Sequence, residues 1–262
     1  MHTKESLKKQ LAAMGLTGEE TILIHSSMKA IGETQKGADT VLDAEFFEKG
    51  LLLLPTHTWK TINAENPVFD VDNEPACVGI LPNLFLKRPG VIRSLHPTHS
   101  MAGYGKDAAS YLAGEEMRNT PCTPGGCYDR LKDVGGKILL VGVGHERNTY
   151  IHSVEEVLNV PNRLSDMPVL MKIVQHGKKP VSVYMRKHYN SQQPHISEDF
   201  VKLNRAFDEC GAAVHTVFGS AECILCDARR IFEVTRHVIA PDPECLVTGG
   251  EIAPERWQEL IR

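Results

Sequence analysis

The sequence of 262 residues predicts an α/β fold in which helical layers cover a largely parallel sheet. Short apolar runs alternate with helical patterns along the chain. The runs are continuously apolar rather than alternating, which is typical of strands covered on both faces. A chain of this length buries about three quarters of the surface that it exposes when unfolded, so it needs no disulfide or metal to fold. We expect one domain over residues 1–262.

Three apolar runs predict the central strands, at residues 21–25, 51–54 and 138–143. A short helix follows the first run, and a second helix is expected from about residue 38 to residue 49, where Gly50 ends it. The segment 56–100 is rich in Pro, His, Asn and Thr and holds one short helix near 80–86. A long irregular segment inside a compact domain is typical of a functional loop.

The C-terminal part of the sequence predicts a hairpin and further helices. Two strands are expected within 168–185, around the turn at 176–180. Two helical patterns flank a β-like run at 212–218. Cys223 and Cys226 are three residues apart in an apolar stretch, a spacing that we interpret as core packing on a helix.

Composition narrows the class of function. The formal net charge is -4, and no run of Lys and Arg predicts a nucleic-acid or lipid surface. No apolar stretch approaches the roughly 20 residues needed to span a bilayer, and the N-terminus lacks the pattern of a secretory leader. Seven irregularly spaced cysteines are expected to be reduced thiols. We therefore expect a cytoplasmic enzyme with a small-molecule substrate.

The first polar motif, HSSMK at 25–29, follows a predicted buried strand and begins a helix. A serine there can cap the helix by accepting a backbone N–H bond. The same helix start can hold a phosphate, with charge added by Lys29. Both interpretations of Ser26 and Ser27 stay open at this point.

Two further polar segments follow strands. His57 and Thr58 come after the second strand, where ligands bind in open α/β sheets, although a simple strand-to-loop turn explains them equally well. The segment RSLHPTHS at 93–100 is dense in hydrogen-bonding groups. We expect Arg93 to tie loop carbonyls together and Ser100 to belong to the site.

The motif with the clearest chemical content is YIHSVEE at 150–156, which begins a helix after the third strand. His152 and Glu155 are three residues apart, so on a helix they share one face. A neutral histidine can accept a proton near pH 7, and a neighbouring carboxylate can fix its tautomer. The spacing alone is also common in surface pairs.

Other chemistries find less support in the sequence. Zinc ligands could come from Cys77 or Cys122 together with several histidines, His25, His57, His96, His99 and His152. There is no HExxH motif and no second CxxC, however. The serine-hydrolase elbow, the phosphate loop and the dinucleotide glycine fingerprint are also missing.

Several long segments in one order resemble the aminoglycoside 3-N-acetyltransferase family. The segments include HSSMKAIG at 25–32, LLLLPTHTW at 51–59, PGVIRSLHPTHSMAGYG at 89–105, KILLVGVGHERNTYIHSVEE at 137–156 and FGSAECILCDARRIFE at 218–233. The resemblance implies a three-layer α/β/α sandwich with a mixed sheet. It also implies direct transfer of acetyl from acetyl-CoA to an amine. The acceptor that it suggests is the 3-amine of a 2-deoxystreptamine aminoglycoside, which attacks the thioester.

The resemblance also implies roles for individual residues. His152 corresponds to the family's essential histidine, and Glu155 to its neighbouring acid. Six residues are expected to contact the coenzyme: Ser26, Ser27, Lys29, Thr58, Ser100 and Met101. Asp70 and Glu222 are candidates for binding the acceptor. We expect no metal and no nucleic-acid or membrane partner, and a homodimer is compatible with the sequence. The alternatives are another acceptor amine, a zinc-dependent hydrolase, or a non-catalytic coenzyme A-binding protein.

Overall fold

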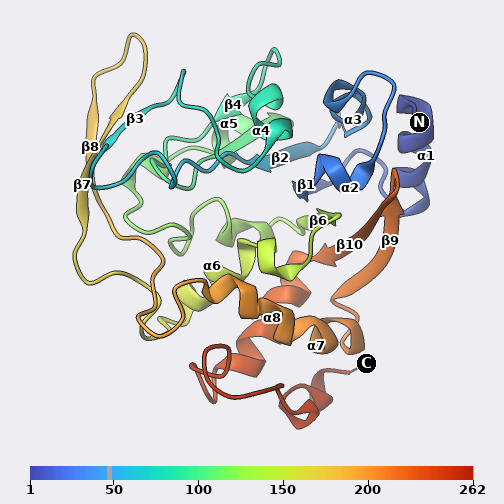
Figure 1. Cartoon of the computed structure of the whole chain (residues 1–262), viewed down its shortest axis with the longest axis vertical. Helices are drawn as coiled ribbons and strands as arrows, with labels where there is room; N and C mark the ends of the chain where they lie inside the picture. Colours follow the sequence, from blue (N-terminus) through green and yellow to red (C-terminus); the bar gives the residue numbers. More distant parts are fainter. Residues whose placement is uncertain (46–48, 262) are drawn as a thin grey trace.

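The computed structural model describes residues 1–45 and 49–261 and has a seven-stranded sheet at its centre (Figure 1). The strand order is β4-β5-β2-β1-β6-β10-β9. In that order the strands are β4 Ile92–Arg93, β5 Met101–Gly105, β2 Leu51–Pro55, β1 Thr21–Ser26, β6 Lys137–Val141, β10 Ala221–Asp227 and β9 Ala213–Phe218. The three predicted central strands are confirmed as β1, β2 and β6.

The sheet is mixed, and its parallel pairing is confined to the centre. β1 pairs in parallel with β2 on one side and with β6 on the other. The remaining pairs are antiparallel, from β2 through β5 to β4 and from β6 through β10 to β9. The expectation of a largely parallel sheet therefore holds for the three central strands but not for the edges. On one edge the reason is local, because β9 and β10 form a hairpin across Gly219 and Ser220, and such a short turn permits only antiparallel pairing.

Helices cover both faces of the sheet, which confirms the predicted three layers. Alternate residues of the central strands enter two separate apolar cores; Leu53 lies in one and Leu52 in the other. The core that contains Leu53 is covered by α5 Ala108–Tyr111, α6 Tyr150–Val157, α7 Asn204–Glu209 and α8 Ala228–Ile239. The other is covered by α1 Lys4–Ala13, α2 Met28–Ile31, α3 Ala38–Glu45 and α4 Ile80–Phe85.

A second, three-stranded sheet lies beside the main one, at the left of Figure 1. It consists of β3 Val68–Asp70, β7 Val169–Val174 and β8 Val181–Met185, in the order β3-β7-β8. β7 and β8 are the predicted hairpin, whereas β3 falls in the segment that the sequence predicts as loop. The small sheet has its own apolar core, which includes Phe69, Ile173 and Val183.

Short 3-10 helices complete the described chain, at Glu115–Met117, Asp129–Lys132, His145–Arg147, Ile196–Leu203, Pro254–Arg256 and Gln258–Leu260. The helix expected at 38–49 is observed from Ala38 to Glu45, and residues 46–48 lie outside the described residues. No helix among the described residues is both long and apolar enough to cross a membrane. The single domain over 1–262 stays a prediction.

One local prediction is wrong. Cys223 and Cys226 lie on β10, not on a helix, and pair with Val141 and Ile138 of β6. Their side chains enter opposite cores, as alternation along a strand requires. Both are buried, so the interpretation as core residues holds.

Candidate active site

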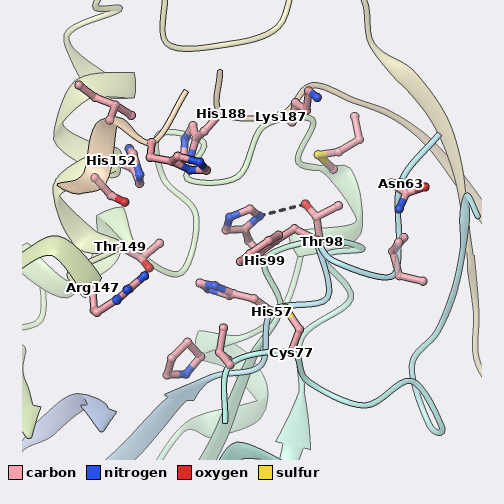
Figure 2. Close-up of a pocket in the computed structure, with 18 of the residues that line it drawn as sticks. His57, Asn63, Cys77, Thr98, His99, Arg147, Thr149, His152, Lys187 and His188 are labelled. Carbon is pink, nitrogen blue, oxygen red and sulfur yellow. Dashed lines mark hydrogen bonds between the residues drawn. The ribbon is translucent and has the colours of Figure 1, made fainter. Parts of the chain in front are cut away.

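A cleft of about 950 Å³ lies where the carboxyl ends of the central strands face the small sheet (Figure 2). One side of the cleft is lined by His25 and Ser26 of β1, by Pro55 of β2 and by Val143, just after β6. Met171 of β7 belongs to the opposite wall. The position agrees with the rule that ligands of α/β sheets bind beyond the carboxyl ends of the strands, and the volume suits a small-molecule site.

His152 lines this cleft from the first turns of α6. Its Nδ1 lies 2.8 Å from Oε2 of Glu155, one helical turn further along. If Glu155 is ionised, it can only accept, so Nδ1 carries the proton and Nε2 keeps a free lone pair. No partner for Nε2 is found in the described part of the chain. The helix thus presents one unprotonated imidazole nitrogen to the cleft.

Arg163 holds the other oxygen of the same carboxylate, with its Nε 2.6 Å from Oε1 of Glu155. Both side chains are almost completely buried, at 2% and 1% exposure. Burial raises the pKa of Glu155, but the hydrogen bonds and charges of His152 and Arg163 outweigh it and lower the pKa overall. Glu155 is therefore ionised and fixed in position, and it in turn orients His152.

The pKa of His152 is lowered from its ordinary value of 6.5, because burial and the neighbouring His188 disfavour the charged ring. Glu155 acts in the opposite direction without reversing the shift. His152 is therefore neutral near pH 7, as a proton acceptor must be. The carboxylate of Glu155 lies where it can stabilise a protonated ring.

A second histidine–glutamate pair lies directly beside the first. The rings of His188 and His152 stack with centroids 4.0 Å apart, and Nε2 of His188 lies 2.7 Å from Oε1 of Glu156. Glu156 also accepts hydrogen bonds from the hydroxyl of Thr120 and from the backbone N–H of Cys122. This pair is not predictable from local sequence, because His188 follows β8 and nothing near it indicates contact with α6.

The row of rings continues along the cleft from His188 to His99 and His57, as Figure 2 shows. Burial lowers the pKa of His57 and of His99, and the neighbouring histidines add to the shift. Within the described residues, one group of three potential metal ligands comes together, formed by Cys122, Glu156 and His188. Direct hydrogen bonds join this group, since Oε1 of Glu156 accepts from the backbone N–H of Cys122 and lies 2.7 Å from Nε2 of His188.

The residues predicted to contact the coenzyme do not all lie at the cleft. Ser26 lines the cleft, whereas Thr58, Ser100 and Met101 are fully buried behind it. The Ser100 hydroxyl lies 2.7 Å from the carbonyl of Thr56, to which it donates, and it accepts from Nε of Arg93. The Thr58 hydroxyl donates to the carbonyl of Pro97, and Met101 is a core residue of β5. The Ser100 and Thr58 side chains hold the loops together, because their hydroxyls are already paired, and Met101 packs in the core.

Four further predicted residues also lie away from the cleft lining. Ser27 caps α2 by accepting the N–H of Ala30 at 3.3 Å, and Lys29 is exposed. Asp70 caps its own loop by accepting bonds from Asn73. Glu222 is exposed on β10. Arg93 behaves as predicted, since it donates to loop carbonyls, including those of Thr56 and Glu74.

Comparison with known proteins places the chain in a family. The family model described as aminoglycoside 3-N-acetyltransferase matches residues 23–240. Aminoglycoside N(3)-acetyltransferase VII of Streptomyces paromomycinus is 27% identical over 264 residues, covering 88% of this chain and 89% of the relative.

Two of the solved structures that share the fold contain a bound ligand. One is aminoglycoside acetyltransferase AAC(3)-IVa, as a histidine-to-alanine variant with gentamicin, with a TM-score of 0.80, 24% identity and coverage of 99% of this chain and 97% of that one. The other is AAC-IIIb with CoASH, with a TM-score of 0.76, 22% identity and coverage of 90% and 95%. Because the family model spans most of the sequence, the chain belongs to the aminoglycoside 3-N-acetyltransferase family.

Proposed function

We propose that this chain transfers acetyl from acetyl-CoA to an amino group, with the 3-amine of a 2-deoxystreptamine aminoglycoside as the acceptor that its family suggests. Membership of the family supports the reaction class. The relatives solved with gentamicin and with CoASH support the two substrates. The observation that carries the proposal is the free Nε2 of His152, which faces the cleft while Glu155 holds Nδ1.

In the proposed mechanism His152 acts as a general base. The neutral amine attacks the thioester carbonyl, and Nε2 of His152 accepts the proton that the attacking nitrogen loses. Glu155 stabilises the imidazolium, and Arg163 keeps Glu155 in position. When the tetrahedral intermediate breaks down, the thiolate of coenzyme A leaves and takes the proton from the imidazolium. The ring is then neutral again for the next cycle.

We place the coenzyme against the carboxyl ends of the strands. Ser26 and Val143 line the cleft there, and Arg147 supplies a positive charge that suits its phosphates. Ser26 keeps its predicted role in this proposal. Ser27 contributes as the cap that fixes the first turn of α2.

The test is release of coenzyme A thiol from acetyl-CoA in the presence of an aminoglycoside. We expect His152→Ala to lower kcat/KM by about 10²–10⁴, the usual effect of removing a general base. His176→Ala is the matched control, because His176 is exposed in the turn between β7 and β8. Near-normal turnover by a folded His152→Ala variant would refute the role of the base.

A further inference from the structure

His99 is the third ring of the histidine row and lines the cleft together with Thr98. Its ring centroid is 5.7 Å from that of His188 and 4.5 Å from that of His57. Among the described residues, one hydrogen bond reaches the ring; it joins Nδ1 to the Thr98 hydroxyl at 3.0 Å (Figure 2). The second ring nitrogen, Nε2, has no partner in the described part of the chain, so it is available to a ligand.

The Thr98 hydroxyl determines which nitrogen of this ring carries the proton. Thr98 is 5% exposed, and within the described residues its hydroxyl has no acceptor other than Nδ1 of His99. A buried hydroxyl hydrogen without an acceptor is costly, so the hydroxyl donates to Nδ1, and Nδ1 keeps its lone pair. The neutral ring therefore carries its proton on Nε2.

The ring is neutral near pH 7. Burial lowers the pKa of His99 well below its ordinary value of 6.5, and the neighbouring His57 adds to the shift. A neutral imidazole is a much weaker acid than an imidazolium, so it can donate a hydrogen bond from Nε2 without losing the proton.

His99 and His152 thus offer opposite functions to the same cleft. The ring of His188 contacts both of them, with its centroid 4.0 Å from that of His152. His152 presents a nitrogen lone pair, because Glu155 holds its Nδ1, whereas His99 presents an N–H. Acyl transfer uses both at one carbonyl group: a base for the attacking nitrogen, and a donor for the oxygen on which negative charge develops.

We propose that His99 is a catalytic residue whose Nε2–H stabilises the oxyanion of the tetrahedral intermediate, with Thr98 as its positioning residue. As the amine nitrogen bonds to the thioester carbon, the π electrons of the carbonyl move onto the oxygen, which accepts the hydrogen bond. The proton stays on His99 throughout. When the carbon–sulfur bond breaks, the electrons return to the carbonyl. This role rests on the acetyl transfer proposed above.

The kinetic test is His99→Leu, which removes the donor and keeps a side chain of similar size. We expect kcat to fall by about 10²–10³, the usual cost of losing one oxyanion donor, while KM for acetyl-CoA changes by less than about threefold. His176→Leu makes the same exchange at an exposed position and should leave kcat unchanged. An unchanged kcat with a raised KM for the aminoglycoside would overturn the proposal, because the ring would then only bind the acceptor.

A matched pair at Thr98 tests the position of the proton. Thr98→Ser keeps the hydroxyl and should keep the wild-type kcat, whereas Thr98→Val keeps the shape alone and should lower kcat several-fold. In wild-type protein with ¹⁵N-labelled histidine, the NMR signals that disappear in His99→Leu should report a protonated Nε2 and an unprotonated Nδ1. A protonated Nδ1 would contradict the proposal whether or not the chain transfers acetyl.

The carbonyl group of bound acetyl-CoA separates this proposal from the proposed function. With ¹³C at that carbonyl and no acceptor present, its infrared stretch should lie at lower frequency on the wild-type chain than on His99→Leu, because the hydrogen bond weakens the C=O bond. Such a shift without thiol release to an aminoglycoside would support the contact of His99 and contradict the transfer. Thiol release with equal bands on the two chains would support the transfer and overturn the role of His99.

Discussion

Glu155 is held by His152 on one oxygen and by Arg163 on the other, so its charge matters for stability as well as for chemistry. Glu155→Gln keeps the shape but leaves the buried guanidinium without its nearest counter-charge. We expect the free energy of unfolding to fall by about 3 kcal/mol, the usual cost of breaking a buried pair from one side. Chemical denaturation measures this, and Glu33→Gln, an exposed glutamate, is the control. Unchanged stability would show that the pair is not formed.

The environment of His152 predicts the pH dependence of the reaction. The proposed mechanism requires the neutral ring, so kcat/KM should fall as the pH falls through the pKa of His152. Burial and His188 lower that pKa, and the acid limb of the profile should therefore have its midpoint below 6.5. The measurement is kcat/KM against pH with saturating acetyl-CoA. A midpoint above 6.5 would contradict the assignment, because it would indicate a base stabilised in its charged form.

At the scale of elements, the N-terminus of α8 is stabilised by one side chain. Asp227 is the N-cap, and its carboxylate accepts the N–H of Arg230 at 3.0 Å. Asp227→Ala should lower the free energy of unfolding by about 1 kcal/mol through loss of the cap. Asp227→Asn should retain most of it, since Asn caps as well as Asp. Denaturation midpoints of the two variants check this, and equal losses would assign the effect to the ion pair with Lys137 instead.

The strands also show which elements can be predicted from local sequence and which cannot. Strands β1, β2 and β6 are predictable because their runs are apolar on both faces and bounded by polar residues. Cys223 and Cys226 mislead because a short apolar run fits a helix or a strand equally well, and only pairing with β6 decides. β3 is invisible locally, since its three residues become a strand by pairing with β7.

On the scale of the whole molecule, buried histidines predict acid sensitivity. Burial lowers the pKa of six of them, to about 4 for His25 and His145; the others are His57, His96, His99 and His152. The unfolded chain therefore binds protons first as pH falls, and stability should decline from about pH 6.5 down to about 4. Burial raises the pKa of Glu45 to about 8. This single group changes stability with pH in the opposite direction, because the folded chain binds its proton more tightly than the unfolded chain does. Unfolding midpoints against pH test the decline, and a flat profile would contradict it.

The candidate site is only partly predictable from the sequence, because distant parts of the chain contribute to it. His152 and Glu155 are predictable because one helical turn joins them. His188 and Arg163 are not, because loops bring them to α6 from later in the chain. Ser100 illustrates the converse, since a polar side chain beside a predicted site is used by the fold itself, through Thr56 and Arg93.

The stacking of His188 on His152 connects two walls of the cleft. Met185 of the small sheet lines the cleft only three residues before His188, and Glu156, which anchors His188, is the next residue after Glu155. The orientation of the His152 ring is therefore fixed twice, by the carboxylate of Glu155 and by a neighbouring ring whose own position depends on Glu156. Two adjacent carboxylates of one helix thus hold two adjacent imidazoles that come from separate parts of the chain.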